Sequence, residues 1–186
     1  MGNLSKTRIL VEGAIMIALA TVLSYIKFFD LPQGGSITFE MLPLVVMGLR
    51  HGPKWGALTG FVHGLIQMIL GFSNVLYCNT LLSQAGCILL DYLLAFSVLG
   101  LACVFKKMVK NQFAGCLVGA FVVGLLRFVC SFLSGWLLWG SYAPEGQSAY
   151  MYSLIYNGSY MIPNIIILVI IIAIIYKINP RIFSKQ

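Results

Sequence analysis

The chain has 186 residues, of which 60% are hydrophobic and 9% are charged, and its mean hydropathy is +0.94. Ordinary globular domains carry about 25% charged residues, so this composition excludes a water-soluble domain with a polar surface and predicts an integral membrane protein surrounded by the lipid bilayer. The formal net charge of +7 does not indicate nucleic-acid binding, because the basic residues stand in short clusters between apolar runs and form no basic helix face.

Six apolar segments follow one another along the chain, and each is predicted to be a helix. They cover residues 8–28, 37–50, 53–72, 81–105, 113–139 and 149–178. A helix needs about 20 apolar residues to span a bilayer, so the short second segment, which contains Pro43, is the least secure of the six spans. The predicted fold class is an all-α integral membrane protein: a six-transmembrane-helix bundle that forms a single domain over residues 1–186.

The positions of Lys and Arg predict the orientation of the bundle. Ten of these twelve residues fall on one side of the predicted membrane; they are Lys6, Arg8, Arg50, Lys54, Lys106, Lys107, Lys110, Lys177, Arg181 and Lys185. The other side has only Lys27, and Arg127 lies within the fifth segment. By the positive-inside rule the ten-residue side is cytoplasmic, which places the N- and C-termini in the cytoplasm. The external loops are then predicted to carry Asp30, Glu40 and Glu145.

Small residues recur at every fourth position in three of the segments. These ridges are Ala14 and Ala18, then Gly56, Gly60 and Gly64, and then Gly115 and Gly119. Such spacing lets helix backbones approach closely in lipid, where packing drives helix association. Each ridge is open to two interpretations: packing inside the bundle, or docking to a partner membrane protein.

No residue pattern in the chain indicates a metal site or an enzyme. The five cysteines form no CxxC pair and lie nearly all in apolar segments, so we expect them to be buried thiols. His51 and His63 have no second ligand three or four residues away, which makes a metal site improbable. The chain shows no serine–histidine–acid set, phosphate loop or paired carboxylates, so we predict no catalytic residues.

Asp91 is the polar residue that most needs an explanation. It lies in the fourth segment, nine residues after Leu82, and a rise of about 1.5 Å per residue places it about 14 Å from the outer end of the helix. A carboxylate at that depth costs about 2.5–3.5 kcal/mol, so it should face a partner or a cavity. Two interpretations stay open. Asp91 forms an ion pair with Arg127, or it belongs to a ligand site, either together with Arg127 or without it.

Tyrosines are concentrated where the fifth segment leads into the sixth. An aromatic belt at the membrane surface explains several of them. However, Tyr152, Tyr156 and Tyr160 recur at every fourth position and form a stripe that reaches about two turns into the helix. Asn157 lies beside this stripe, and a buried amide needs hydrogen-bond partners. Together with Asp91, these side chains suit a flat, cationic small molecule that forms hydrogen bonds.

The order and spacing of several motifs resemble a known family nearly from end to end. The motifs include EGAIMIALA, PLVVMGLRHG, LLDYLLAFSVLG and, as the most specific, SGWLLWGSYAPEGQSAYMYSLIYNGSYMIP. They are similar to the thiamine-specific substrate-binding (S) components of energy-coupling factor vitamin transporters. The resemblance implies six helices, cytoplasmic termini and a thiamine pocket near the outer face of a prokaryotic plasma membrane. It implies no cofactor and no ATPase activity, because a transmembrane coupling subunit and two cytoplasmic ATPases supply the energy from ATP.

The resemblance also implies site residues and their roles. The implied substrate-binding residues are Asp91, Tyr92, Ser131, Gly135, Trp139, Tyr152 and Asn157, and the implied docking residues for the coupling subunit are Ala14 and Ala18. The thiazolium of thiamine is a permanent cation, so Asp91 would supply the counter-charge and Trp139 an aromatic face. Asn157 and Tyr152 would meet the donors and acceptors of the aminopyrimidine.

One position departs from the family pattern, since Ser131 stands where members of the family carry histidine. A serine cannot stack on a ring, which puts the choice among thiamine, its pyrimidine precursor and analogues in doubt. Two other readings also stay open. An S component for an anionic vitamin would need an unpaired Arg127 in the pocket, and in a structural membrane protein without a ligand Asp91 and Arg127 would simply pair.

Overall fold

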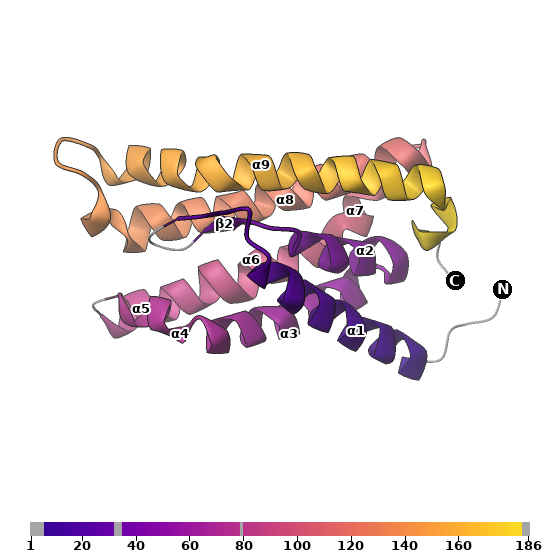
Figure 1. Cartoon of the computed structure of the whole chain (residues 1–186), viewed down its shortest axis with the longest axis horizontal. Helices are drawn as coiled ribbons and strands as arrows, with labels where there is room; N and C mark the ends of the chain where they lie inside the picture. Colours follow the sequence, from indigo (N-terminus) through magenta and orange to yellow (C-terminus); the bar gives the residue numbers. More distant parts are fainter. Residues whose placement is uncertain (1–5, 32–34, 79, 184–186) are drawn as a thin grey trace.

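Nearly all of the described chain is helical, as the apolar segments predict (Figure 1). The computed structural model describes residues 6–31, 35–78 and 80–183. Its helices, in chain order, are α1 (Lys6–Tyr25), α2 (Met41–His51), α3 (Pro53–Leu70), α4 (Phe72–Leu76), α5 (Leu81–Cys87), η1 (Ile88–Leu94), α6 (Ala95–Ser97), η2 (Val98–Leu101), α7 (Ala102–Lys106), α8 (Gln112–Leu138), η3 (Gly140–Tyr142), α9 (Ala149–Ile178) and η4 (Pro180–Phe183). The elements from α5 to α7 follow one another without a break, so they form one segment, called the 81–106 helix below.

Each predicted apolar segment is helical over most of its length. In the described part of the chain, four helices are long and apolar enough to cross a membrane: α1, the 81–106 helix, α8 and α9. The second segment is again the weakest, because α2 has only 11 residues. The all-helical membrane fold is therefore confirmed, whereas the count of six spans and the cytoplasmic position of the termini stay predictions.

The connection between the first two segments contains a short hairpin that the sequence did not reveal. Strand β1 (Phe29–Asp30) pairs antiparallel with β2 (Ser36–Ile37), with Phe29 opposite Ile37. The predicted helices 8–28 and 37–50 are too long at these ends, because the residues nearest the connection hydrogen-bond across the hairpin instead. Figure 1 shows β2 alongside α9, and the Asn164 amide of α9 donates a hydrogen bond to the Ser36 carbonyl at 2.8 Å.

Local residue chemistry explains where several helices begin. The side chains of Asn111 and Ser148 accept hydrogen bonds from backbone N–H groups in the first turns of α8 and α9, as N-cap residues do. Gly52 separates α2 from α3 with a φ of 88°, a value that glycine adopts readily. Pro53 follows as the first residue of α3, where its missing N–H is not needed.

The glycine ridges of α3 and α8 are packing surfaces inside the bundle. A Cβ at Gly60 or Gly64 would collide with backbone atoms of the 81–106 helix, and one at Gly115 or Gly119 would collide with the carbonyl oxygens of Lys106 and Ala102. The α1 ridge differs, because Ala14 and Ala18 are exposed. Only the α1 ridge is thus left available to a partner.

Replacing Gly100 with alanine should destabilise the bundle. Gly100 lies in η2, and a Cβ there would overlap the backbone of Gly56 in α3. Overpacking of this kind costs about 1–3 kcal/mol, so thermal unfolding in detergent should show a lower midpoint. Gly158→Ala is the matched control, because the nearest atom to a Cβ there is Ile162 Cδ1 at 3.7 Å. Equal midpoints for the two variants would contradict this assignment.

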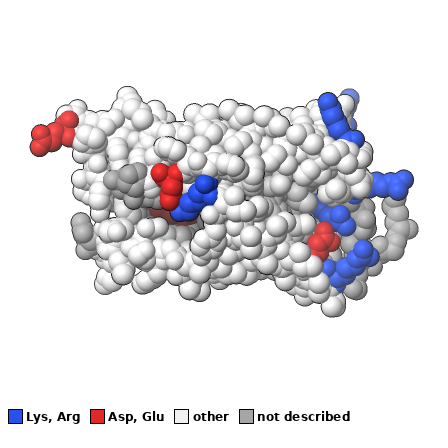
Figure 2. All heavy atoms as spheres, viewed as in Figure 1, with Lys and Arg blue, Asp and Glu red and all other residues white. Residues whose placement is uncertain are grey.

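The basic residues gather at one end of the molecule. Figure 1 places the start of α1 and the end of α9 at this end, and Figure 2 shows most of the blue atoms there. At this end Glu12 of α1 links α1 to α2, with contacts to Arg50 Nε at 2.9 Å and His51 Nε2 at 3.1 Å. Lys185 lies outside the described residues. The arrangement agrees with the predicted cytoplasmic side without fixing the orientation.

Candidate ligand-binding site

A cavity of about 350 Å³ lies between the helix ends that are remote from the basic end. Its wall includes Tyr25 at the end of α1, Leu70 at the end of α3 and Tyr152 in the first turn of α9. The volume falls within the range of about 300–1,000 Å³ that is usual for small-molecule sites. All of the predicted substrate-binding residues line it, namely Asp91, Tyr92, Ser131, Gly135, Trp139, Tyr152 and Asn157.

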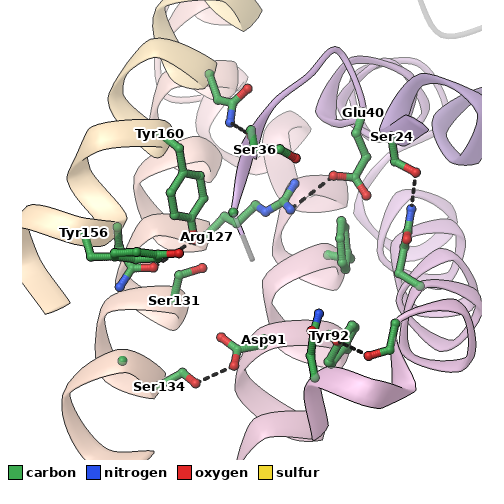
Figure 3. Close-up of a pocket in the computed structure, with 18 of the residues that line it drawn as sticks. Ser24, Ser36, Glu40, Asp91, Tyr92, Arg127, Ser131, Ser134, Tyr156 and Tyr160 are labelled. Atoms are coloured by element: carbon green, nitrogen blue, oxygen red, sulfur yellow. Dashed lines mark hydrogen bonds and ion pairs between the residues drawn. The ribbon is translucent and has the colours of Figure 1, made fainter. Parts of the chain in front are cut away.

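Asp91 is positioned by an irregular turn of its helix. It lies in η1, where the 81–106 helix widens into a π-helical turn, and such turns are frequent at functional sites. Ser134 of α8 donates a hydrogen bond from Oγ to Asp91 Oδ2 at 2.5 Å (Figure 3). The neighbouring Tyr92 donates from its hydroxyl to the Gly71 carbonyl at 3.2 Å. The carboxylate is therefore held in place by a neutral hydroxyl group and directed at the cavity.

The ion pair between Asp91 and Arg127 that the sequence left open is not formed among the described residues. Arg127 instead contacts Glu40, with 3.3 Å between Nη2 and Oε2, and its guanidinium lies 4.2 Å from the centre of the Phe96 ring. Figure 3 shows Arg127 directed toward Glu40, whereas Asp91 is bonded to Ser134. Of these two carboxylates, Glu40 therefore has a cationic partner and Asp91 has none among the described residues.

Glu40 corrects a prediction from the sequence. It was assigned to an external loop, but its residue is only 7% exposed. It precedes α2 and lines the cavity, where His63 of α3 contacts its second oxygen at 3.0 Å. The loop assignment failed because the residue stands at the start of an apolar segment and turns inward between α3 and α8.

Asn157 is held by a chain of hydrogen bonds between α9 and α8. Its amide nitrogen donates to the Ser153 carbonyl at 3.0 Å and to Ser153 Oγ at 3.1 Å, and Ser153 Oγ donates to the Phe132 carbonyl at 2.7 Å. Tyr160 donates from its hydroxyl to Asn157 Oδ1 at 2.8 Å. Both amide hydrogens are committed within the chain, so Asn157 can offer a ligand only an acceptor, the remaining lone pair of Oδ1.

Gly135 makes this close arrangement of α8 and α9 possible. A Cβ at Gly135 would overlap Ser153 Oγ and would come within 2.8 Å of Asn157 Nδ2. The absence of a side chain therefore lets the Asn157 amide reach the wall of the cavity. The close-packed position implied by the family resemblance agrees with this geometry.

Aromatic side chains form the wall of the cavity on α9. The ring centres of Tyr152 and Tyr156 are 5.5 Å apart, and those of Tyr156 and Tyr160 are 6.4 Å apart. All three line the cavity, as does Trp139 at the end of α8. The predicted tyrosine stripe is confirmed as a wall of the cavity rather than only a belt at the membrane surface.

Several residues of the site were missed because no single pattern identified them. Ser134, which holds Asp91, stands with Arg127 and Ser131 on one face of α8 at intervals of four and three residues, a polar stripe that could have been found. Gln67 of α3 also lines the cavity, and its amide nitrogen donates to Ser24 Oγ of α1 at 2.8 Å. No sequence spacing links those two residues.

The described residues contain no cluster of three or more side chains that could hold a metal ion. The five cysteines are all unpaired thiols; Cys78, Cys87 and Cys116 are buried, and Cys103 and Cys130 are partly buried. Burial raises the pKa of the Cys78 thiol in the loop before α5, so it is in the protonated form at neutral pH. The groups that the cavity offers to a ligand are therefore hydrogen-bonding side chains, aromatic rings and the Asp91 carboxylate.

Comparison with known proteins gives a consistent result over nearly the whole chain. Residues 10–184 match the family described as thiamine transporter protein (Thia_YuaJ). The thiamine transporter ThiT of Bacillus subtilis (strain 168) is 34% identical over 196 aligned positions, which cover 99% of this chain and 98% of that protein. ThiT of Lacticaseibacillus paracasei is 28% identical and covers 96% of this chain and 91% of that protein. A solved structure of ThiT from Listeria monocytogenes has a TM-score of 0.81 and 28% identity, and covers 97% of this chain and 100% of that one.

Proposed function

Because this chain belongs to the thiamine transporter family, we propose that it is the thiamine-binding S component of an energy-coupling factor importer and captures thiamine in the cavity around Asp91. It is a transport protein rather than an enzyme, and its apolar helices make it a multi-pass membrane protein. The finer organisation is part of the proposal: residues 1–186 form a single six-span domain in the prokaryotic plasma membrane, with both termini in the cytoplasm.

The observation that supports thiamine most directly is the state of Asp91. Its carboxylate lines the cavity, accepts a hydrogen bond from the neutral Ser134 hydroxyl and has no ion-pair partner in the described part of the chain. A buried charge without a partner is unfavourable, so a cation that enters the cavity gains a strong interaction. The thiazolium of thiamine supplies that charge, and the aromatic face of Trp139 adds a cation–π contact.

The aminopyrimidine of thiamine fits the wall formed by α9. Tyr160 occupies one lone pair of Asn157 Oδ1, and the other is available as an acceptor for the amino group. The Tyr152 ring offers a flat surface, and Ser131 provides a hydroxyl that can donate or accept. Since Ser131 is small, we propose that it hydrogen-bonds the ligand instead of stacking against it.

The coupling part of the proposal rests on the outer face of α1. Ala14 and Ala18 are exposed there, whereas the glycine ridges of α3 and α8 are used inside the bundle. Small residues let a second helix approach closely in lipid. We propose that a transmembrane coupling subunit docks on Ala14 and Ala18, and that two cytoplasmic ATPases bound to it supply the energy.

Titration of the purified protein with thiamine should quench its tryptophan fluorescence with a sub-micromolar midpoint. Of the three tryptophans, Trp139 lines the cavity, and stacking of the ligand on its ring is the expected cause of quenching. Isothermal calorimetry should give the same midpoint. In the control variant Trp139→Phe the quenching should be lost while heat of binding is still released. If saturating thiamine produces neither quenching nor heat, the thiamine assignment is wrong.

The structure disfavours the two other functions considered from the sequence. An anionic vitamin would need a free cation in the cavity, but Arg127 is paired with Glu40. A purely structural protein would be expected to pair Asp91 with Arg127, which the described residues do not do.

The pyrimidine precursor of thiamine lacks the thiazolium and would leave Asp91 without a counter-charge. In the same titration it should therefore bind more weakly than thiamine.

A further inference from the structure

We propose that Glu40 determines the charge specificity of the cavity as a positioning residue: by binding Arg127 it keeps the guanidinium from neutralising Asp91, and so keeps the site selective for a cation. This inference rests on the proposed function, because it concerns how the same cavity distinguishes thiamine from an uncharged molecule of the same shape.

The first step is a count of the charges that line the cavity. They are Lys27, Asp30, Glu40, Asp91 and Arg127. Four of these form two ion pairs, with 2.8 Å between Lys27 Nζ and Asp30 Oδ2 and 3.3 Å between Arg127 Nη2 and Glu40 Oε2. Asp91 alone has no ion-pair partner among the described residues. The lining therefore has a net negative charge that is concentrated on one carboxylate.

The second step is the way in which Glu40 is fixed. Its side chain is 10% exposed, and each oxygen has its own partner: Oε2 contacts Arg127 from α8, and His63 Nε2 from α3 donates to Oε1. His63 is fully buried and packs edge-on against Phe96, with 4.8 Å between the ring centres. Arg127 lies over the same Phe96 ring. Glu40, His63 and Phe96 thus define one position for the guanidinium.

The third step is that Arg127 and Asp91 line the same cavity. Arg127 belongs to α8, and Asp91 is hydrogen-bonded to Ser134 of the same helix. Arg127 stands two turns before Ser134, on the same face of the helix, and Ser134 is the residue that binds Asp91. A guanidinium released from Glu40 would keep its charge in this cavity and act on Asp91 and on any bound cation. Because a partly buried site screens charges less than water does, the effect on a cationic ligand would be large.

The fourth step is that the two members of the pair should have opposite effects when they are changed singly. Glu40→Gln removes the negative charge and leaves Arg127 unneutralised, which disfavours a cation. Arg127→Gln removes the positive charge and leaves a second carboxylate in the cavity, which favours one. A residue that only stabilised the fold would shift the binding of charged and uncharged ligands in the same direction.

The test compares thiamine with its neutral isostere, in which a carbon atom replaces the positively charged ring nitrogen. Affinities for both are measured by calorimetry on the full chain in detergent. Glu40→Gln should weaken thiamine by about tenfold or more, with a change within about twofold for the isostere. Arg127→Gln should keep or increase the preference for thiamine, and the double variant Glu40→Gln/Arg127→Gln should restore the preference of the unmodified protein.

Glu12→Gln is the matched control, because Glu12 also contacts one arginine and one histidine, Arg50 and His51, but at the basic end of the bundle. It should leave both affinities unchanged. The double variant retains no charge at either position, so it reports on the cavity even if Glu40→Gln alone fails to fold.

The outcomes separate this inference from the function on which it rests. If the unmodified protein does not bind thiamine, or binds the neutral isostere equally well, the proposed function is wrong and the role of Glu40 is overturned with it. If the unmodified protein prefers thiamine but Glu40→Gln keeps the same ratio of affinities, only the role of Glu40 is overturned. The same holds if Glu40→Gln and Arg127→Gln lower the ratio equally, or if Glu40→Gln does not fold and the double variant lacks the preference.

Discussion

Replacing Asp91 with asparagine is expected to weaken thiamine binding by about thirtyfold or more. Truncating one member of a buried charge pair costs about 2–5 kcal/mol, and each 1.4 kcal/mol is about tenfold in affinity. Asparagine has nearly the same size and can still accept the hydrogen bond from Ser134, which is 1% exposed and bonded to the carboxylate. The loss should therefore come from the charge and not from a change of shape. Calorimetry on the purified variant measures it.

The neutral isostere of thiamine distinguishes this explanation from a structural one. Its affinity should change little in Asp91→Asn, because it has no charge for the carboxylate to balance. Equal losses for the two ligands would show that Asp91 shapes the cavity and does not act as a counter-charge. Thermal unfolding of the ligand-free variant should resemble that of the unmodified protein or show a higher midpoint, since a buried charge has been removed.

The double substitution Ala14→Trp/Ala18→Trp is expected to abolish thiamine uptake while leaving binding intact. Both residues are exposed on α1, and two indole rings there would keep a second helix from close approach. The cavity should not be disturbed, because neither residue lines it. Uptake of labelled thiamine by cells that contain the coupling module measures the first effect, and calorimetry on the purified variant measures the second.

A matched control for this pair is available on another exposed helix face. Ile166 and Ile170 of α9 have the same spacing, and each is 53% exposed. Ile166→Trp/Ile170→Trp places the same two indole rings, at the same spacing, on an exposed helix face and should leave uptake unchanged. Normal uptake in the α1 variant, or equal loss in both variants, would remove the assignment of Ala14 and Ala18 as the docking site.

Much of the fold could be predicted because the signals that define a membrane helix are local. The ends of the predicted segments 53–72, 81–105, 113–139 and 149–178 lie within two residues of the helices that the structure describes. The hairpin before α2 was missed, since Ile37 was counted as the first residue of the apolar segment 37–50 and its pairing with β1 depends on contacts across the turn.

Among the site residues, too, some features follow from local sequence and others only from contacts between distant segments. The tyrosine stripe on α9 was predictable, because residues at every fourth position share one face of a helix, and the family motifs located Asp91 and Trp139. The π-helical turn around Asp91 was not predictable, since the stretch from Ile88 to Leu94 contains no residue that requires it. In the folded chain this turn places the Tyr92 hydroxyl 3.2 Å from the Gly71 carbonyl while Asp91 lines the cavity.

The sequence by itself determined that this protein is a membrane protein, where its helices lie and which residues could bind a cation. Only the tertiary structure decided which charged side chains form ion pairs. Arg127 had two carboxylates available, and the sequence offered Asp91 as its partner because both residues lie within long apolar segments. In the folded chain Glu40 enters the cavity from the segment before α2 and binds Arg127. The choice depends on distances between segments far apart in the chain, and no spacing along the sequence encodes those distances.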